Sequence, residues 1–448
     1  MDNFRFDALS TLDRLFTRKI LFLDREYNFI FKKKKYSSSD RARLVGVVRG
    51  VVKLYPWLDQ IADSYLSRAD KLPHLVRNAL RIGIFELIFY TRTPDFVVVN
   101  EIVEVVKKKG MTGFAPLVNA ILRQINEKKE SYQEEAKSWF FPLPAWLEED
   151  WHSWLKQEEL INLKQALLLP PPTYLRVNTY KIDPQCLFKS LTQRGIVVES
   201  VSDFPQTLKV EADYTSLIQT PEYKQGYFYP QDFSSQLAVE VVKPLPGETV
   251  FDIGCGAGGK TTALAQKMIN QGRIWAWDTN SQKINTLYQN VKRMGFSIIQ
   301  AQVVSSGPPP SNFWRKGDRV LVDAPCSGLG TLAKNPEIVL KVTPQKIADF
   351  SQLQKRLLLE SSLLVKSGGL MIYCVCTVTE RETVEVVADF EKEKGSDFQR
   401  INLRWREVFP EKPFLDSRIE EGKIKGTFTI WPHFFSSDGF FIVAWRRK

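Results

Sequence analysis

The 448-residue sequence has few cysteines and histidines and no long apolar run, and each scarcity excludes a class of protein. Its five cysteines are too few for a disulfide framework, and none of them forms a C-x-x-C pair. Its three histidines, His74, His152 and His433, lie far apart, so we expect no metal site. No stretch reaches the roughly 18 uncharged apolar residues that a membrane span needs. The first residues lack a basic segment followed by an apolar one, so we expect no secretory signal, a cytoplasmic location and no membrane partner.

What is present is an ordinary globular composition with a basic surplus. With 44% hydrophobic and 25% charged residues, the sequence is neither collagen-like nor disordered, and its length predicts two to four domains. The net charge is +11, and residues 1–50 contain 12 Lys or Arg against 6 Asp or Glu. This surplus favours a polyanionic partner, nucleic acid first. The run Lys32–Lys35 by itself is better explained as a solvated face.

The amino-terminal third shows helical periodicity, which predicts an all-α domain over residues 1–135. Apolar residues recur at helical spacing in two sets, Leu9, Leu12, Leu15 and Phe16, and Leu80, Ile84, Leu87 and Ile88. A further helix is expected to begin at an N-cap Asn100, to carry the stripe Ile102, Val105 and Val106, and to end with Lys107–Lys109 before Gly110. A helical bundle must bury one face of each helix, so we expect these stripes in the core.

Between residues 136 and 225 the pattern predicts a linker helix and a small α+β module. Proline-rich breakers occur at Phe141–Pro144 and Pro170–Pro172. Beyond them we expect a strand at Tyr174–Asn178, a helix at Leu187–Arg194 and a strand at Gly195–Val198.

Residues 226–448 alternate between strand and helix, which predicts an α/β Rossmann-like domain with a parallel doubly wound sheet. The strand candidates are Thr249–Phe251, Ile274–Trp277, Arg319–Val322 and Leu370–Tyr373. Ligands bind beyond the carboxyl ends of such strands. We therefore expect one crevice to collect Asp252, Asp278, Asp323–Cys326 and Cys374–Cys376.

The segment Gly254–Thr261 fits both the dinucleotide fingerprint G-x-G-x-x-G and the P-loop pattern G-x-x-x-x-G-K-T. The carboxylates of Asp252 and Asp278 would each repel a triphosphate by about 3 kcal/mol at roughly 5 Å. They suit S-adenosylmethionine, which carries an ammonium and a sulfonium. A P-loop nucleotide hydrolase and a redox dinucleotide enzyme remain alternatives. The residues expected to bind the methyl donor are Gly254, Cys255, Gly256, Ala257, Gly258, Gly259, Lys260, Asp278 and Asp323.

Two thiol-bearing segments carry the most specific signal in the chain. Asp323-Ala324-Pro325-Cys326-Ser327-Gly328-Leu329-Gly330 and Tyr373-Cys374-Val375-Cys376-Thr377 each follow a predicted strand. One such cysteine alone is better explained as a small buried hydrophobe. Together, these segments resemble the D-A-P-C-S-G-x-G and Y-S-T-C-S signatures of RNA (cytosine-5) methyltransferases.

The resemblance extends over nearly the whole chain. It includes Leu175–Thr179, Gln231–Gln236 and Asp438–Phe441. The amino-terminal third, with Arg81–Leu87 and Val99–Glu101, resembles the NusB-type RNA-binding helical domain. This pairing is typical of 16S rRNA methyltransferases of the RsmB/Sun type.

The resemblance implies the chemistry and the roles of three side chains. Cys376 would add to C6 of a cytosine, which makes C5 nucleophilic toward the methyl group of S-adenosylmethionine. Cys326 would assist proton removal and release, and Asp323 would hold the cytosine edge. The target base must be flipped out or single-stranded. The implied partner is 16S rRNA, to which the helical domain over residues 1–135 and the α+β module over residues 136–225 would bind. We expect a monomer.

Several positions depart from the family pattern or are open to two interpretations. Gly254–Lys260 replaces C-A-A-P-G-G-K, Cys374-Val375 replaces Ser-Thr, and Ser305 and Ser306 stand where an acidic residue near the adenine is usual. These departures motivate an alternative, a non-catalytic RNA-binding or antitermination-type protein with a decayed methyltransferase domain.

Lys334–Glu337 is either a substrate-side segment or an exposed turn. Arg176 and Asn178 either contact RNA or support a strand edge, and Trp431–Phe441 is expected in the core or at a sheet edge.

Overall fold

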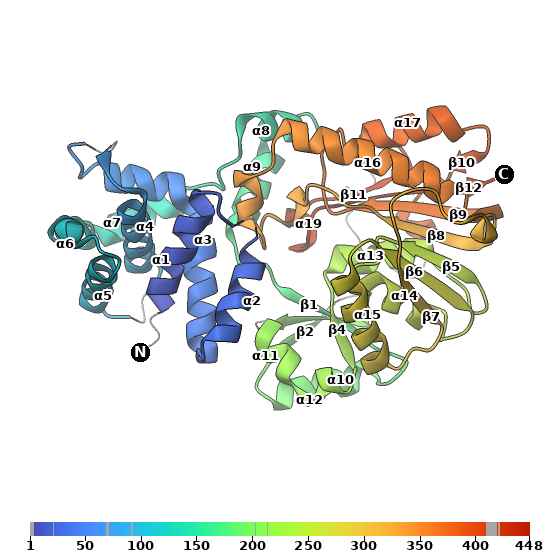
Figure 1. Cartoon of the computed structure of the whole chain (residues 1–448), viewed down its shortest axis with the longest axis horizontal. Helices are drawn as coiled ribbons and strands as arrows, with labels where there is room; N and C mark the ends of the chain where they lie inside the picture. Colours follow the sequence, from blue (N-terminus) through green and yellow to red (C-terminus); the bar gives the residue numbers. More distant parts are fainter. Residues whose placement is uncertain are drawn as a thin grey trace. The chain divides into compact units, whose positions relative to one another are not determined.

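The computed structural model describes residues 4–20, 22–68, 71–90, 93–201, 203–212, 214–408, 419 and 422–448, and the chain divides into two compact units (Figure 1). The helical unit falls within residues 1–144, 167–169 and 334–341. The sheet unit falls within residues 145–166, 170–333 and 342–448. The domain limits after residues 135 and 225 stay predictions.

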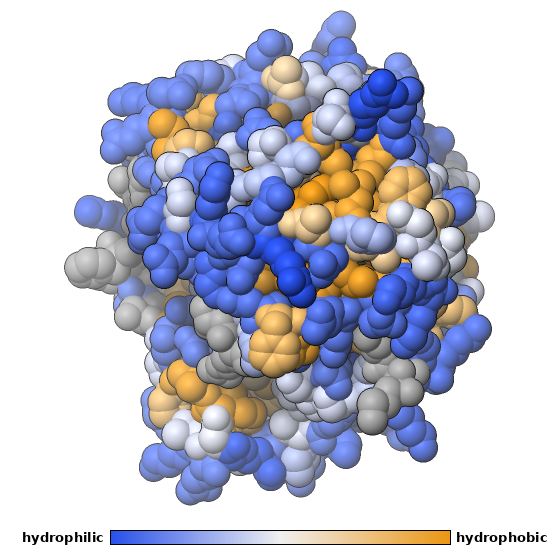
Figure 2. Space-filling model, turned by 90° about the vertical axis from the view of Figure 1, so that its left-hand side faces the viewer, coloured by the Kyte–Doolittle hydropathy of each residue, from blue (hydrophilic) through white to orange (hydrophobic). Residues whose placement is uncertain are grey.

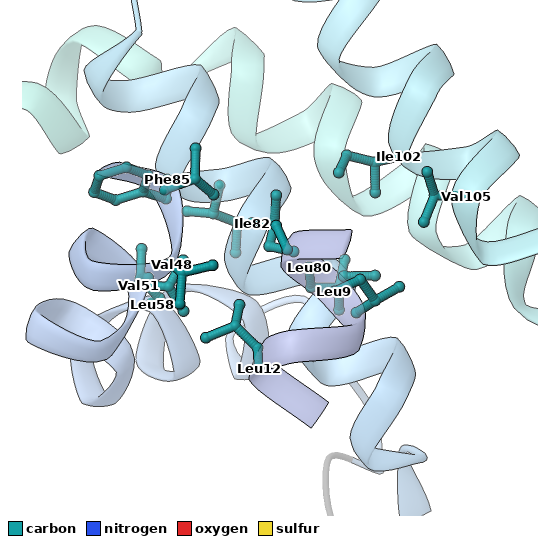
Figure 3. Close-up of a cluster of buried hydrophobic side chains, with 14 of the residues drawn as sticks. Leu9, Leu12, Val48, Val51, Leu58, Leu80, Ile82, Phe85, Ile102 and Val105 are labelled. Carbon is teal, nitrogen blue, oxygen red and sulfur yellow. The ribbon is translucent and has the colours of Figure 1, made fainter. Parts of the chain in front are cut away.

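The helical unit confirms the predicted all-α character of the amino-terminal third. Its α-helices are α1 (Phe4–Phe16), α2 (Leu23–Lys33), α3 (Ser38–Asp63), α4 (His74–Phe89), α5 (Asp95–Lys108), α6 (Ala115–Glu127) and α7 (Lys129–Ala136), with the short 3-10 helix η2 (Thr112–Phe114) before α6. The predicted stripes supply Leu9 and Leu12 from α1 and Leu80 from α4 to the core, where they meet Val48 and Val51 of α3 (Figure 3). Helices α1, α4 and α5 therefore bury the faces that their periodicity indicates.

The predicted N-cap at Asn100 is wrong, because Asn100 lies inside α5. The helix begins at Asp95, directly after Pro94, whose φ of −58° already suits a helix start. Asp95 also places a negative charge at the positive end of the helix dipole. The predicted carboxyl end is confirmed: Lys107 and Lys108 form the last turn, and Gly110 follows with a φ of +79°.

The segment containing Lys334–Glu337 forms the short 3-10 helix η5 (Pro336–Leu340) within the helical unit. Glu337 is 2% exposed, and its carboxylate accepts a hydrogen bond of 3.1 Å from the Leu23 N–H. Burial raises the pKa of this carboxyl above its usual value. The exposed-turn alternative is therefore wrong, and a substrate-side role for Lys334–Glu337 stays a prediction.

The face that Figure 2 shows is mostly hydrophilic, with apolar areas in more than one place. Phe96, at 69%, is the most exposed large apolar side chain among the described residues of the helical unit. Among the described residues, no helix is both long enough and apolar enough to cross a membrane.

A small four-stranded antiparallel module follows the linker helices α8 (Ala145–His152) and α9 (Gln157–Leu168). Its strands are β1 (Thr173–Val177), β2 (Val197–Ser200), β3 (Thr207–Glu211) and β4 (Phe228–Pro230), in the order β2-β3-β1-β4, and its helices are α10 (Pro184–Gln193), α11 (Tyr214–Gln219) and α12 (Pro221–Lys224). The predicted α+β module is confirmed. Strand β2 begins two residues later than predicted, because Gly195 adopts a φ of +78° in a turn.

The larger sheet has the strand order β10-β12-β9-β8-β5-β6-β7, with β11 paired to β12. Its strands are β5 (Thr249–Ile253), β6 (Arg273–Asp278), β7 (Ile299–Val303), β8 (Gly317–Asp323), β9 (Val365–Val375), β10 (Phe398–Arg400), β11 (Phe428–Ile430) and β12 (Phe440–Arg447). Strands β9, β8, β5, β6 and β7 pair in parallel, as the sequence predicts. Strand β12 pairs antiparallel with β9, β10 and β11 and makes the sheet mixed.

Helices cover both faces of this sheet (Figure 1). They are α13 (Phe233–Val242), α14 (Gly259–Lys267), α15 (Ser281–Met294), α16 (Pro344–Ser362), α17 (Val384–Lys394), α18 (Trp405–Val408) and α19 (Pro432–Phe435), with the 3-10 helices η3 (Ser311–Phe313) and η4 (Leu329–Thr331). Successive residues of β8 alternate between two buried clusters: Leu321 packs with α13–α15, whereas Val320 and Val322 pack with α16 and α17. Because β5 pairs with β6 on one side and β8 on the other, the topological switch point lies at its carboxyl end.

Candidate active site

The glycine loop at the switch point brings the ends of β5 and β8 into direct backbone contact. Gly254, the first residue after β5, has a φ of +80°, and its N–H donates to the Trp277 carbonyl at 2.8 Å. A Cβ atom built on Gly254 would lie only 2.2 Å from the Asp323 carbonyl oxygen. The loop then leads into α14 at Gly259. Only glycine satisfies both the backbone angle and this close approach.

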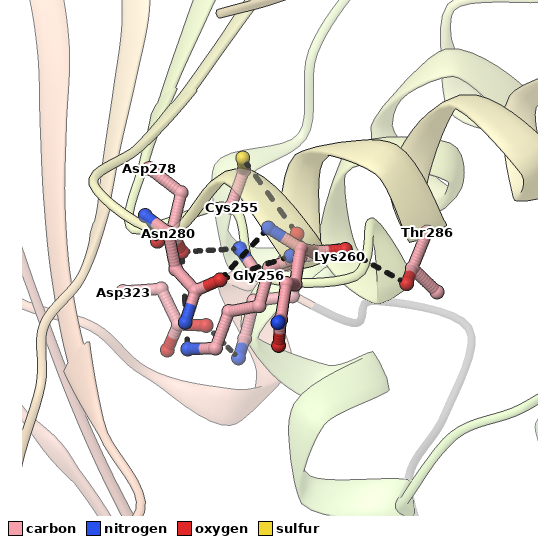
Figure 4. A network of polar contacts seen from close by, with 9 residues as sticks. Cys255, Gly256, Lys260, Asp278, Asn280, Thr286 and Asp323 are labelled. Atoms are coloured by element: carbon pink, nitrogen blue, oxygen red, sulfur yellow. Dashed lines mark hydrogen bonds and ion pairs between the residues drawn. The ribbon is translucent and has the colours of Figure 1, made fainter. Parts of the chain in front are cut away.

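Two acidic side chains hold the loop from beneath. Asp278, at the end of β6, accepts hydrogen bonds from the Gly256 N–H at 3.0 Å and the Asn280 N–H at 2.8 Å (Figure 4). Asp252, at 0% exposure, accepts a 2.6 Å bond from the Thr261 hydroxyl through Oδ2. Its Oδ1 is buried and has no hydrogen-bond partner among the described residues. Burial raises the pKa of Asp252 to about 7.

Lys260 connects the glycine loop to the end of β8. Its Nζ lies 2.7 Å from the Asp323 carboxylate and 5.1 Å from the centre of the Phe440 ring. Burial lowers the pKa of Lys260, but the Asp323 carboxylate and the nearby Cys374 and Cys376 thiols together raise it above its ordinary value. The amine is thus bound to a carboxylate, whereas a P-loop lysine must be available to phosphates. The Cys374 thiol donates to the other oxygen of Asp323 at 3.5 Å.

The two predicted reactive cysteines lie together. The Sγ atoms of Cys326 and Cys376 are 3.3 Å apart, and both side chains are half-buried. The hydrogen bond with Cys376, together with burial, raises the pKa of Cys326 well above its ordinary value. Either sulfur can donate its S–H in this contact, so each thiol is within hydrogen-bond reach of the other.

Backbone contacts join the two cysteine loops to the start of β12. The Gly330 N–H donates to the Cys376 carbonyl at 3.1 Å, and the Gly439 N–H donates to the Gly330 carbonyl at 2.8 Å. A Cβ atom on Gly330 would lie 2.0 Å from the Gly439 carbonyl oxygen. A Cβ atom on Gly439 would in turn lie 2.9 Å from the Gly330 Cα atom, so the close approach of the two segments favours glycine at both positions. Phe440 and Phe441 are buried in β12, so the predicted core or sheet-edge position of this aromatic segment is confirmed.

The predicted donor-binding and catalytic residues lie at the carboxyl edge of the sheet. Some of their side chains are buried beneath the glycine loop and do not face outward. The Cys255 side chain is buried in the core beneath the loop, and burial raises the pKa of its thiol. The Ala257 carbonyl is bound by Asn290 at 3.0 Å. Ser305 and Ser306 are exposed beyond β7.

Arg176 and Asn178 support the fold instead of facing solvent. The buried Arg176 guanidinium donates to the Gly259 carbonyl at 2.6 Å and to the Thr262 hydroxyl at 2.7 Å. Asn178, at 0% exposure, donates to the carbonyls of Gly226 and Met294. These bonds attach the four-stranded module to α14 and α15. The structural interpretation of both residues is confirmed, although Arg176 lies in β1, which pairs with a strand on each side.

Sequence reasoning missed a buried carboxylate next to the thiols. Glu382 is 0% exposed and accepts hydrogen bonds from Ser327, which follows Cys326, and from Thr377, which follows Cys376. The sequence signal was weak, since Glu382 stands among several other acidic residues, Glu380 and Glu385 among them. Together, the Rossmann-like sheet, the glycine loop at its switch point and the thiol pair beside it define a methyltransferase domain.

Comparison with known families agrees with this class. Residues 239–446 match the family 16S rRNA methyltransferase RsmB/F, residues 5–127 match the NusB family, and residues 143–215 match the ferredoxin-like domain of RsmF/B-like methyltransferases. The chain belongs to the RsmB/F methyltransferase family, with an amino-terminal NusB domain and a ferredoxin-like module. The P-loop hydrolase and redox dinucleotide alternatives are thereby excluded.

Curated relatives share most of this architecture. A Bacillus subtilis protein named "Probable ribosomal RNA small subunit methyltransferase B" is 29% identical over 428 residues, which cover 94% of this chain and 93% of the relative. The human 28S rRNA (cytosine(4447)-C(5))-methyltransferase is 32% identical over 304 residues, which cover 64% of this chain and 36% of the relative. Membership of this family makes the chain an enzyme and not a binding module alone.

Solved structures show the same fold. PH0851 matches with a TM-score of 0.77 and 24% identity, covering 98% of both chains. A methyltransferase homologue from Pyrococcus horikoshii matches with a TM-score of 0.53 and 27% identity, covering 66% of this chain and 92% of the other.

Proposed function

We propose that this protein transfers a methyl group from S-adenosylmethionine to C5 of a cytosine in RNA, with 16S rRNA as the substrate. The single observation that carries the proposal is the pair of half-buried thiols, 3.3 Å apart, which follow β8 and β9. Cytosine C5 is a poor nucleophile, and a thiolate added to C6 is the means of activating it. The names of the curated relatives, which act on ribosomal RNA, support the substrate class.

The residues at the switch point fit the proposed donor. Gly254–Gly258 would let the backbone approach it closely, and Asp278 would accept from its ribose hydroxyls. The buried Oδ1 of Asp252 has no hydrogen-bond partner among the described residues and could accept from a donor group of the ligand. S-adenosylmethionine, when bound, supplies a methyl group on a positively charged sulfonium.

The thiol pair divides into a nucleophile and an assistant. Cys376 matches the cysteine of the Y-S-T-C-S signature, which is the nucleophile in the resembling family, so Cys376, 3.3 Å from the Cys326 sulfur, would carry the negative charge. Its thiolate would form a bond to C6, and the C5–C6 π electrons would then be available at C5 for the methyl group. Asp323 would hold the edge of the cytosine and favour protonation at N3. The site thus supplies a nucleophile and a base-orienting carboxylate.

Release of the product requires the C5 proton to leave and the sulfur–C6 bond to break. Once Cys376 is bonded to carbon, it no longer carries the charge that opposes ionisation of Cys326. Cys326 would then lose its proton to solvent and accept the proton from C5. The C5–H electrons would restore the ring double bond and expel the Cys376 thiolate.

Incubation with methyl-labelled S-adenosylmethionine and 16S rRNA tests the proposal. We expect label in 5-methylcytosine of wild-type reactions and none with Cys376→Ala. A Cys186→Ser variant is the matched control, because Cys186 is an exposed cysteine outside the site. Label in another base, or in cytosine despite Cys376→Ala, would contradict the proposed chemistry.

A further inference from the structure

The two thiols come from separate loops, so something must fix the distance between them. Cys326 lies after β8 and Cys376 after β9, 50 residues further along the chain. The main-chain bond between Gly330 and the Cys376 carbonyl holds the far end of one loop. It does not hold the residues immediately after each cysteine, Ser327 and Thr377.

The Glu382 carboxylate contacts both of these residues. Its Oε1 accepts from the Ser327 N–H at 2.8 Å, and its Oε2 accepts from the Ser327 hydroxyl at 2.5 Å. The same Oε2 is 3.4 Å from the Thr377 hydroxyl and 3.2 Å from the Thr379 hydroxyl. The Ser327 and Thr377 hydroxyls also lie 2.9 Å from each other. One side chain therefore ties the segment after Cys326 to the segment after Cys376.

Helix α16 reinforces this bridge. The Gln354 side-chain amide donates to Glu382 Oε1 at 3.0 Å and to the Pro325 carbonyl, directly before Cys326, at 2.9 Å. The Tyr373 hydroxyl donates to the Glu382 main-chain carbonyl at 2.7 Å and so fixes the base of the side chain. The bridge is thus anchored to α16 and to β9.

The 377–382 segment is also held from helix α8. The Trp151 indole N–H donates to the Val378 carbonyl at 2.6 Å, and Asp150 accepts from the Glu380 N–H at 3.3 Å. With the segment fixed at these points, Glu382 has little freedom to leave the bridge. Its burial would be costly without the donors that surround it, since an unpaired buried carboxylate is strongly unfavourable.

We propose that Glu382 is a positioning residue of the methyl transfer, which sets the distance between the Cys326 and Cys376 sulfur atoms by binding Ser327 and Thr377 together. The inference rests on the proposed function of the two thiols. This role differs from general stabilisation of the fold, because Glu382 would control one particular distance, the one between the two sulfur atoms. Loss of the carboxylate should therefore change the thiol geometry and kcat more than RNA binding.

The direct test measures how fast the two thiols join when oxidised. Diamide converts two neighbouring thiols to a disulfide and is itself reduced to a hydrazine, so the rate reports their proximity. In a Cys186→Ser background, Glu382→Ala should slow formation of the Cys326–Cys376 disulfide, followed by mass and thiol count, by about 10-fold. This readout needs no RNA or donor, so it distinguishes failure of this inference from failure of the proposed function.

Steady-state kinetics supply the second readout. Glu382→Ala should lower kcat by about 100-fold, because a displacement of the reacting sulfur atoms by about 1 Å has an effect of this size. The KM for RNA should stay within about threefold of the wild-type value. Glu382→Gln should recover most of the rate, because its carbonyl can accept from Ser327 N–H while its amide donates to the hydroxyls. Glu385→Gln, exposed in the first turn of α17, is the matched control and should change neither readout.

The outcomes that overturn the inference are specific. A folded Glu382→Ala protein with the wild-type disulfide rate and kcat would do so, as would a loss confined to KM. If Glu382→Ala fails to fold, Ser327→Ala removes one hydroxyl of the same bridge, and it should lower kcat and the disulfide rate by about fivefold. An unchanged Ser327→Ala protein would then overturn the inference.

Discussion

The two halves of the site are built in different ways. The donor side is largely backbone, a glycine loop of consecutive residues whose shape depends on Gly254 and on bonds to Asp278. The thiol side is made of side chains from segments 50 residues apart, held by Glu382. The first half tolerates changes that spare its backbone, whereas the second depends on particular sulfur and carboxylate atoms. Substitutions on the two sides should therefore fail in different ways.

The largest effect is expected on the thiol side. Cys376→Ala removes the atom that bonds to C6, so methylation should fall by at least about 10³-fold while donor binding is unchanged. Donor affinity is measured by calorimetry and turnover by label transfer. Weakened donor binding in this variant would show that the two sides are not separable.

The donor side should fail through its backbone. Gly254→Ala places a Cβ atom 2.2 Å from the Asp323 carbonyl at a φ of +80°, which should cost about 3 kcal/mol of stability and at least about 10-fold in donor affinity. Gly368→Ala is the matched control, because Gly368 has a φ of +75° and open space around it. Urea unfolding should show a loss of about 1 kcal/mol for Gly368→Ala. Equal losses in the two variants would contradict the close-approach argument.

The buried carboxyl of Asp252 gives the donor side a pH signature. Its pKa of about 7 in the folded state lies above the unfolded value of 3.8. Between pH 4 and 7 Asp252 is protonated in the native state and ionised in the unfolded state. The free energy of unfolding therefore falls as pH rises through this range, by on the order of 1.4 kcal/mol per pH unit and a few kcal/mol in total. Asp252→Asn should lack this slope in denaturant titrations across that range. Asp349→Asn, at an exposed site, should give a curve parallel to wild type.

The smallest effect is expected at Cys374, which stands where the resembling family has serine. Its thiol donates to Asp323 at 3.5 Å, so Cys374→Ser keeps a donor and should leave kcat within about threefold. Cys374→Ala removes the donor and should lower kcat by about fivefold, because the loss of one hydrogen bond costs about 1 kcal/mol. A severe loss in Cys374→Ser would show that the departure from the family pattern matters in itself.

The same difference decides what could be predicted from the sequence. The helical stripes, the strands and the glycine loop depend on neighbouring residues, so periodicity and spacing reveal them. Glu382 could not be singled out, because its partner Ser327 lies 55 residues away and Gln354 lies 28 away. The error at Asn100 has a local cause. The helix begins after Pro94, whereas the prediction placed its N-cap at the polar residue Asn100.

The antiparallel addition to the sheet shows a further limit. The aromatic composition of Trp431–Phe441 predicts a position in the core or at a sheet edge. It does not predict that the strand β12, which begins at Phe440, pairs with β9. Strand pairing depends on which edge the rest of the fold leaves open. The placement of Lys334–Lys341 in the helical unit likewise depends on Leu23, more than 300 residues away.

The central claim is that the Cys376 sulfur bonds to the cytosine ring, and trapping that bond tests it most directly. With Cys326→Ala, addition can occur but release is impaired, so an RNA–protein adduct that survives denaturation should accumulate. Digestion and mass spectrometry should then find the nucleotide on the peptide that carries Cys376. A nucleotide attached to any other residue, or full methylation with no adduct in this variant, would contradict the account.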